Sequence, residues 1–241
     1  MCVLKYKRVL LKLSGEALKG DGDFGFKDDV VKRIAHEIAE THKLGVQIAV
    51  VVGGGNIFRG ELGKRWGMDK AAADYVGMLA TIMNGLILQE FLTNEFGVET
   101  RVQTAIAMPA VAEPFIRLRA IRHLNKGRVV IFGGGTGNPH VTTDTAAALR
   151  AAEIKADAIL MAKNKVDGVY SADPNKDPSA KKIEFLTFED YLRQGLRVMD
   201  PAGVSLSQQA NIPICVFDFD KDGSIRKIVC GDRVGTLVGS R

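Results

Sequence analysis

The chain has 241 residues, 46% of them hydrophobic, so it can bury a core without the help of disulfides or a structural metal. Its net charge of +5 is spread along the chain and interleaved with acidic residues, which argues against a nucleic-acid-binding protein and fits a small anionic ligand equally well. No uninterrupted apolar run reaches the roughly 18 residues that span a bilayer, and the N-terminus lacks the order of a signal peptide, so we expect a soluble cytoplasmic protein.

Apolar runs rich in Val, Ile and Leu alternate with stretches of helical periodicity. In chain order they predict a strand at 8–13, a helix at 28–43, a strand at 46–52, a helix at 69–96, a strand at 100–104, a helix at 114–125, a strand at 128–132, a helix at 142–154, a strand at 158–161, a helix at 187–194 and a strand at 214–218. Such alternation is typical of an α/β fold with a mainly parallel sheet covered by helices. No Pro/Gly/Ser-rich linker divides the chain, so we expect a single domain.

One stretch breaks this alternation. Residues 163–185 are polar and rich in turn signals, such as Asp167-Gly168 and Asp173-Pro174. We interpret them as a hairpin and a loop over the edge of the sheet.

Three predicted strands end in glycine-rich turns. They are Lys12-Leu13-Ser14-Gly15, the segment 53–60 with its Gly53-Gly54-Gly55, and the segment 133–139 with its Gly133-Gly134-Gly135. Glycine after a strand is common turn chemistry, so each turn alone says little. Together they direct backbone N–H groups and helix N-termini at one edge of the sheet, which predicts an anion site there.

The well-known phosphate-binding motifs do not account for this site. The Gly-x-x-x-x-Gly-Lys-Ser/Thr pattern of P-loop kinases and the His-Arg-Asp and Asp-Phe-Gly elements of protein kinases are absent. The segment 20–25 matches Gly-x-Gly-x-x-Gly by letter, but Asp21 and Asp23 would repel a pyrophosphate and no strand directly precedes it.

Four charged residues are candidates for chemistry, and each has a plainer alternative. Lys12 ends an apolar strand beside a glycine turn, where it could reach a phosphate or merely extend to solvent. Arg59 could present a guanidinium fork to phosphate oxygens or be a solvated loop residue. Asp144, at a predicted helix start, could hold cationic groups in place, whereas Asp74 could simply be an exposed helical aspartate.

Other catalytic classes have no support. The four histidines and the cysteines Cys2, Cys215 and Cys230 show no metal-ligand spacing and no Cys-x-x-Cys pair, so we expect ordinary reduced thiols. A Gly-x-Ser-x-Gly hydrolase elbow is also missing.

Taken together, the motifs resemble those of bacterial-type uridylate kinases, which are members of the amino-acid-kinase superfamily. The resemblance covers about residues 6–237 and is carried by the segments 10–16, 53–60, 74–81, 136–139, 166–170 and 172–174. Acetylglutamate kinase and aspartokinase are similar in layout, but Phe58-Arg59-Gly60 and the segment 74–81 look like those of uridylate kinase.

The resemblance implies a three-layer α/β/α sandwich and a homohexamer. It implies transfer of the γ-phosphoryl group of ATP, with Mg²⁺, to UMP in pyrimidine nucleotide biosynthesis, with GTP as activator and UTP as inhibitor. Within the single domain 1–241, the part up to about residue 140 would mainly bind UMP, and the part from about 141 would mainly bind ATP.

The resemblance also implies roles for individual residues. The catalytic residues would be Lys12, Arg59, Asp144 and a second lysine, Lys165. ATP would be bound by Lys12, Leu13, Ser14, Gly15, Gly55, Arg59, Asn164, Tyr170 and Asp173. UMP would be bound by Gly54, Asp74, Gly135, Thr136, Gly137, Asn138, Pro139, His140, Val141 and Thr142. GTP activation would involve Gly20, Asp21, Gly22, Asp23, Phe24 and Gly25.

Two alternatives stay open at this point. One is a kinase of the same superfamily that forms an acyl phosphate on a carboxylate substrate. The other is a regulator that senses UMP or UTP without turnover, against which the set of Lys12, Arg59 and Asp144 argues.

Overall fold

A computed structural model describes residues 2–164, 166–172, 177, 179–196 and 198–240 of the chain. The strands are β1 (Arg8–Leu13), β2 (Gln47–Val52), β3 (Thr100–Thr104), β4 (Glu113–Pro114), β5 (Val129–Gly133), β6 (Ala158–Lys163), β7 (Val169–Tyr170), β8 (Lys182–Ile183), β9 (Phe185–Thr187), β10 (Ile214–Asp218) and β11 (Thr236–Gly239). The helices are α1 (Asp28–His42), α2 (Gly60–Arg65), α3 (Lys70–Glu90), α4 (Arg117–Asn125), α5 (Thr143–Ile154), α6 (Phe188–Arg193), α7 (Pro201–Gln209) and α8 (Ser224–Val229), with a 3-10 turn η1 (Gly15–Leu18) and a π-helical turn η2 (Phe91–Glu95).

Nine strands form one sheet in the order β4-β3-β5-β2-β1-β6-β10-β11-β9, and β7 pairs with β8 separately. Strands β10 and β11 are antiparallel, and every other neighbouring pair in the large sheet is parallel. This arrangement confirms the predicted α/β fold with a mainly parallel central sheet.

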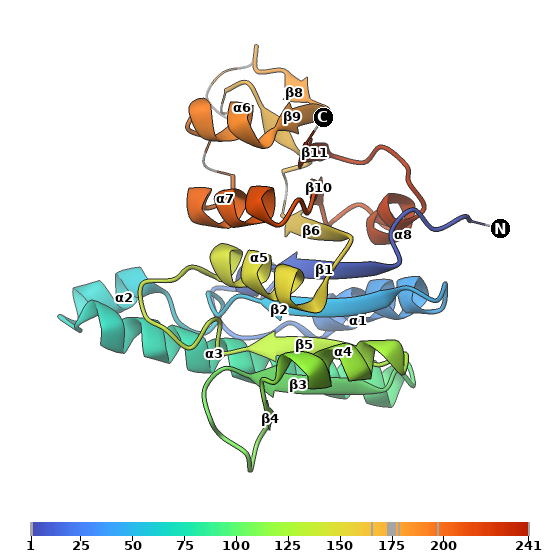
Figure 1. Ribbon diagram of the computed structural model, residues 1–241. Coiled ribbons are helices and arrows are strands. Elements are labelled where there is room, and N and C mark those ends of the chain that lie inside the picture. The colour runs from blue at the N-terminus through green and yellow to red at the C-terminus, as the bar shows by residue number, and fades with distance from the viewer. Residues whose placement is uncertain (1, 165, 173–176, 178, 197, 241) are drawn as a thin grey trace.

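Helices cover both faces of this sheet (Figure 1). Side chains alternate between the faces along β1, so Val9, Leu11 and Leu13 pack in one apolar cluster with α1, α3 and α8. Leu10 points the other way and packs in a second cluster with α4, α5, α6 and α7. The result is the expected three-layer sandwich.

Most predicted elements are confirmed, and the differences have local causes. Four of the predicted helices match α1, α3 with η2, α5 and α6 to within one residue at either end. The fifth was predicted to begin at residue 114, but Glu113–Pro114 pairs with β3 as β4, so α4 begins at Arg117. The helices α2, α7 and α8 and the strands β9 and β11 were not predicted, because each is too short to show a clear period.

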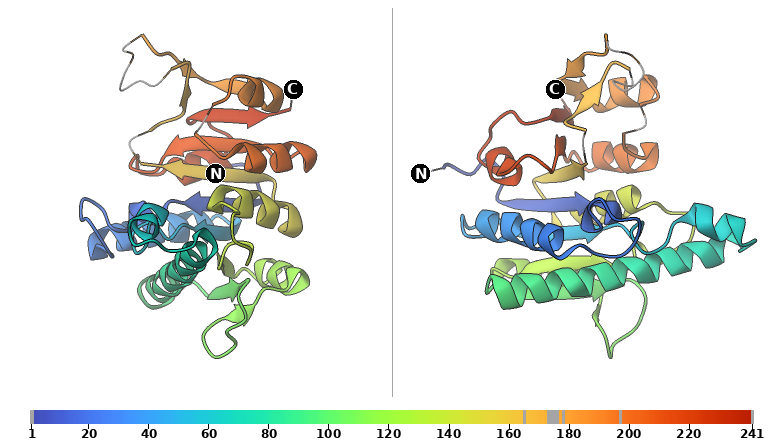
Figure 2. Two further views of the ribbon diagram at one scale, coloured as in Figure 1. Left: turned by 90° about the vertical axis from the view of Figure 1, so that its left-hand side faces the viewer. Right: turned by 180° about the vertical axis from the view of Figure 1, so that it is seen from behind.

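Helix α3 runs along one face of the sheet in the rear view (Figure 2). With η2 it gives a segment, Lys70–Asn94, that is long and apolar enough to cross a membrane by length and composition, with a mean hydropathy of 1.4. Of its most apolar stretch, 44% is buried inside the protein, where Leu88 and Leu92 pack in the core. Core helices of soluble proteins pass the same test, so this helix is weak evidence for a membrane protein.

The expectation of three reduced thiols is wrong for this structure, in which Cys2 and Cys230 form a disulfide. The N-terminal segment lies against the end of α8, where the N–H groups of Lys5 and Tyr6 both donate to the Val229 carbonyl. The two cysteines are 228 residues apart in the sequence, so their spacing could not indicate the pairing. Cys215 is free and buried.

Candidate active site

The carboxyl ends of β1, β2, β5 and β6 meet at one edge of the sheet. These strands are parallel, with Leu13 beside Val52, Val51 beside Phe132 and Lys12 beside Met161. In Figure 1 they point toward the left-hand side, and the left view of Figure 2 looks onto that edge. All three predicted glycine turns therefore open on the same edge, as the sequence predicted.

Lys12 and Asp144 form a buried ion pair at this edge. Lys12 lies on the same face of β1 as Leu10, beneath α5, whose first turn carries Asp144. The Lys12 Nζ atom is 2.7 Å from Asp144 Oδ1, and only 10% and 16% of the two side chains are exposed. A lysine in an apolar strand thus has a partner, which excludes the alternative that it merely extends to solvent.

Asp144 is held in its ionised form. Burial raises the pKa of its carboxyl, but Lys12, Lys163 and the N–H of Asp200 together lower it below its usual range. The Asp200 N–H donates to Asp144 Oδ2 over 3.2 Å, and Asp200 also caps α7 by accepting from the Ala202 N–H. Helix α7 was not predicted, so Asp200 could not be singled out from the sequence.

Lys163 is a second cation near this pair. It ends β6, and burial lowers the pKa of its ammonium group, as does the nearby charge of Lys12, while Asp144 opposes the shift. The predicted second lysine, Lys165, lies outside the described residues, as does the predicted ATP-binding residue Asp173. Lys163 was missed although the signal that identified Lys12, a lysine at the carboxyl end of an apolar strand, applies to it as well.

The turns after β1 and β2 pack backbone against backbone. A Cβ atom at Gly15 would lie 2.5 Å from the Gly53 carbonyl oxygen and 2.6 Å from the Gly55 nitrogen. No side chain fits in that space, so glycine is required at position 15. The Ser14 hydroxyl accepts from the Glu16 N–H and caps η1.

Two buried polar side chains of α3 fix the second and third glycine turns. The Asn84 amide donates to the Gly53 carbonyl over 2.6 Å and is also bonded to Asn56. The Thr81 hydroxyl accepts from the Gly134 N–H over 2.8 Å. Because buried polar groups are costly unless they are hydrogen-bonded, these contacts hold both turns in one position. Neither residue was singled out from the sequence.

A cavity of about 520 Å³ lies between these turns and α3. Seven of the ten predicted UMP-binding residues line it, namely Gly54, Asp74, Gly135, Thr136, Asn138, Val141 and Thr142. Gly55 and Arg59, predicted to contact phosphates, line it too, whereas Gly137, Pro139 and His140 do not. Arg59 pairs with Glu16 over 2.9 Å and is about half exposed, so a bound anion would compete with Glu16 for its guanidinium.

Asp74 joins α3 to the third glycine turn and is therefore more than an exposed helical aspartate. Its Oδ2 accepts from the His140 N–H over 2.8 Å, and Lys70 Nζ lies 2.8 Å from the carboxylate. Burial raises the pKa of Asp74, but these two donors more than offset that effect, so the pKa lies below its usual value. His140 has a left-handed backbone with φ of 65°, and its side chain is exposed.

Asn164 and Tyr170, which were predicted to bind ATP, come after β6 in the chain. The Tyr170 hydroxyl donates to Asp167 Oδ1 over 2.6 Å, and Lys182 and Lys221 pair with the other oxygen of Asp167. The bond from Tyr170 and the two lysines lower the pKa of Asp167. In the described residues the predicted hairpin is present as β7 and β8, and Asn164 is exposed just after β6.

The segment 20–25 lies beside the second glycine turn. The Gly25 N–H donates to the Asn56 carbonyl, and the Asn56 amide donates back to the Gly25 carbonyl over 2.9 Å. Asp23 and Phe24 line a further cavity, of about 590 Å³, whose wall also contains Arg59 and Lys64. The segment is thus in contact with the turn that walls the main cavity.

Within the described part of the chain, no three His, Cys, Asp or Glu side chains converge so that they could hold a metal ion.

Comparison with known proteins gives one consistent result. Residues 7–218 match the model of the amino acid kinase family. The chain is similar to the UMP kinase from Bacillus anthracis, at 48% identity over 97% of this chain and 96% of that one with a TM-score of 0.95. It is similar to the UMP kinase from Ureaplasma parvum, at 37% identity over 98% and 100% with a TM-score of 0.92. It is also similar to the uridylate kinase from Archaeoglobus fulgidus, at 30% identity over 96% and 99% with a TM-score of 0.75. The chain therefore belongs to the amino acid kinase family and, within it, to the UMP kinases.

Proposed function

We propose that this enzyme transfers the γ-phosphoryl group of ATP to UMP, giving UDP and ADP, and so serves pyrimidine nucleotide biosynthesis. The observation that carries this proposal is the Lys12–Asp144 pair, with Lys163 close by, at a sheet edge walled by three glycine turns. Two lysines beside one buried carboxylate leave net positive charge, which suits a transferring phosphoryl group.

Catalysis here consists of positioning and charge stabilisation. The phosphate of a nucleoside monophosphate has a second pKa near 6, so it is largely a dianion at neutral pH and attacks without a general base. Lys12 and Lys163 stabilise the charge that develops on the transferring oxygens, and Asp144 keeps the two ammonium groups in place. Arg59 and the glycine turns hold the phosphates, and Asp74 orients the acceptor nucleotide from α3.

Mg²⁺ enters as part of the donor. It neutralises charge on the β- and γ-phosphates when ATP is bound. Because Asp144 is already paired with Lys12, we do not assign it as a dedicated ligand of the metal.

A coupled assay for ADP release, with ATP, Mg²⁺ and a panel of monophosphates, tests the proposed reaction. We expect strong preference for UMP over CMP, AMP and GMP, because the segment 74–81 and the turn at 136–139 border the acceptor cavity. Equal turnover of CMP would contradict the assigned specificity. ADP release driven by an amino acid and not by UMP would favour the acyl-phosphate alternative, and UMP binding without turnover would favour the sensor.

We propose a division of labour within the single domain 1–241. Residues up to about 140, with the cavity beside α3, mainly bind UMP, and residues from about 141, with Tyr170 and Asn164 after β6, mainly bind ATP. By their positions in the sequence, Asp173 and Lys165 also belong to this ATP-binding part.

We also propose that the enzyme is a homohexamer assembled from dimers in the cytoplasm. Tyr75, Leu79 and Met83 form an exposed apolar stripe at four-residue spacing along α3, between 44% and 50% exposed. Such a stripe on one long helix is suited to pair with its own copy. Sedimentation velocity should give about six times the mass of one chain, and Met83→Glu should lower it, whereas a wild-type monomer would contradict the proposal.

Regulation by GTP as activator and UTP as inhibitor completes the proposed function. Two aspartates among three glycines in the segment 20–25 cannot pack as core, and the segment contacts the second glycine turn through Asn56. Changing Asp21 and Asp23 to Asn should alter the fold-activation by GTP and leave turnover without GTP nearly intact. An unchanged response in a GTP titration would remove this segment from the regulatory site.

The role of His140 is open to a pH experiment. Two roles are possible for it, an imidazolium that attracts the UMP phosphate or a side chain that faces solvent. Because the imidazole is exposed and does not line the cavity, we expect the KM for UMP to change with pH in the same way in His140→Phe and in the wild type over about pH 6 to 8, the range in which histidine side chains generally titrate. Profiles that diverge below about pH 6.5 would show instead that the imidazolium binds UMP.

A further inference from the structure

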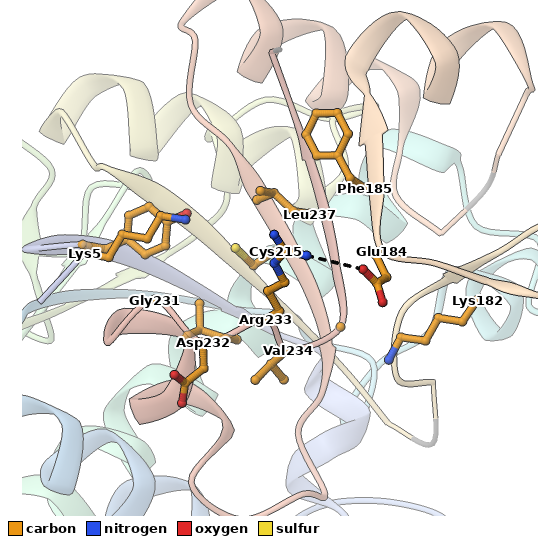
Figure 3. A pocket seen from close by; sticks show the side chains of 13 residues that line it. Lys5, Lys182, Glu184, Phe185, Cys215, Gly231, Asp232, Arg233, Val234 and Leu237 are labelled. Carbon is orange, nitrogen blue, oxygen red and sulfur yellow. Dashed lines mark ion pairs between the residues drawn. The ribbon is translucent and has the colours of Figure 1, made fainter.

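We propose that a separate cavity, at the opposite end of the sheet from Lys12, is a second ligand site that takes a small aromatic anion. The cavity measures about 440 Å³ and lies between the N-terminal segment, the loop 231–235 and the strands β9 to β11 (Figure 3). Lys5 and Tyr6 line it and directly precede β1, so it opens near the amino end of that strand and away from the phosphate edge. Its size is within the range of about 300 to 1,000 Å³ typical of small-molecule pockets.

The walls of this cavity are fixed by the fold. Gly235 has φ of 73°, and a Cβ atom there would clash with the Val216 carbonyl oxygen, so the loop 231–235 rests directly on β10. On the other side, the N–H groups of Lys5 and Tyr6 bond to Val229 at the end of α8. A ligand therefore meets a preformed hollow, which reduces the entropic cost of binding.

The floor is apolar and uncharged. Tyr6 and Cys215 are only 8% and 5% exposed, and Leu237 lies beside them. Burial raises the pKa of the Cys215 thiol to about 11 and also raises that of Tyr6, so both groups are neutral at physiological pH. Phe185 lines the edge of the cavity near Leu237 with 41% of its surface exposed, so it adds apolar surface there (Figure 3).

Charged side chains of both signs line the rim. The cations are Lys5, Lys182 and Arg233 and the carboxylates are Glu184 and Asp232, and Lys182 is also paired with Asp167 over 3.0 Å. Arg233 and Glu184 are 3.8 Å apart and almost fully exposed, as the dashed line in Figure 3 marks, so their mutual attraction is weak.

Lys5 is the cation best placed to bind a ligand. Its ammonium group lies 5.1 Å from the centre of the Tyr6 ring, and among the described residues no carboxylate forms an ion pair with it. A ligand whose aromatic ring packs on the apolar floor and whose anionic group binds the Lys5 ammonium group would match both features of the cavity.

Fluorescence titration with 1-anilinonaphthalene-8-sulfonate, an aromatic monoanion, tests the proposal on the full chain. Saturating UMP and ADP are present so that the nucleotide sites are filled. We expect one probe to bind per chain, Lys5→Glu to weaken binding roughly tenfold through charge repulsion, and Phe185→Ala to weaken it as well.

Two control variants make equivalent substitutions at surface positions outside the cavity. Lys126→Glu makes the same change in net charge at an exposed lysine, and Leu118→Ala removes an apolar side chain that is 68% exposed. Both should bind the probe as the wild type does, and thermal unfolding confirms that all four variants are folded. Equal affinity in Lys5→Glu and the wild type, or equal weakening by Lys5→Glu and Lys126→Glu, would overturn the proposal.

Discussion

Replacing Lys12 with Ala is expected to lower kcat for UMP phosphorylation by about 10² or more, with little change in the affinity for UMP. Lys12 is paired with Asp144 at the phosphate edge and does not line the cavity assigned to UMP. In the proposed mechanism its ammonium group acts on the charge that develops during transfer and not on binding of the acceptor. Steady-state kinetics give kcat, and calorimetric titration gives the dissociation constant for UMP.

Two controls make the result specific. Lys7→Ala removes an exposed lysine just before the same strand and should leave kcat unchanged. Thermal unfolding of Lys12→Ala measures how much stability the protein loses when buried Asp144 has no partner, since removing one member of a buried ion pair is costly. If the defect of Lys12→Ala were confined to UMP binding, the role assigned to Lys12 would be incorrect.

The second large effect is expected at Lys163. Changing it to Met removes a partly buried cation whose pKa responds to both Lys12 and Asp144, so kcat should fall by about 10². Methionine keeps most of the side-chain length, so packing at the end of β6 should be little disturbed. The measurement is kcat at saturating ATP and UMP, for the variant and the wild type.

Lys165→Met is the matched comparison, because the resemblance to uridylate kinases assigned the second catalytic lysine to that position. If Lys163 is the second lysine, Lys165→Met should retain far more activity than Lys163→Met. The reverse order would return the role to Lys165 and leave Lys163 as a lysine that only supports the charge balance around Asp144.

The contacts around Asp144 suggest how the site keeps its geometry. Asp200 donates its N–H to Asp144 and accepts from the Thr142 and Thr145 hydroxyls, so it joins the starts of α5 and α7. A Cβ atom at Gly203 would lie 3.1 Å from the Asp144 carbonyl oxygen, which shows how closely α7 approaches α5. The carboxylate that we propose to orient the two lysines is thus held by contacts with two helices, as precise positioning requires.

The sequence by itself determined the fold class and the edge of the sheet at which the glycine turns and the candidate site lie. Apolar runs alternating with amphipathic stretches require a covered parallel sheet, and glycine turns after parallel strands must open on the same edge. Lys12 and Asp144 could be singled out because a charged residue at the end of an apolar strand or at a helix start near an anion site needs a partner.

Only the tertiary structure decided which partners meet. Asn84 and Thr81 look like ordinary polar residues of a helix, yet they fix two glycine turns that lie about 30 to 50 residues away in sequence. Lys163 and Asp200 reach Asp144 because β6 lies next to β1 and α7 packs on α5, and the pairing of Cys2 with Cys230 depends on α8 ending beside the N-terminal segment. Local sequence patterns indicate where helices, strands and turns form. Contacts between distant segments depend on the strand order and on the helix packing, which local patterns do not specify.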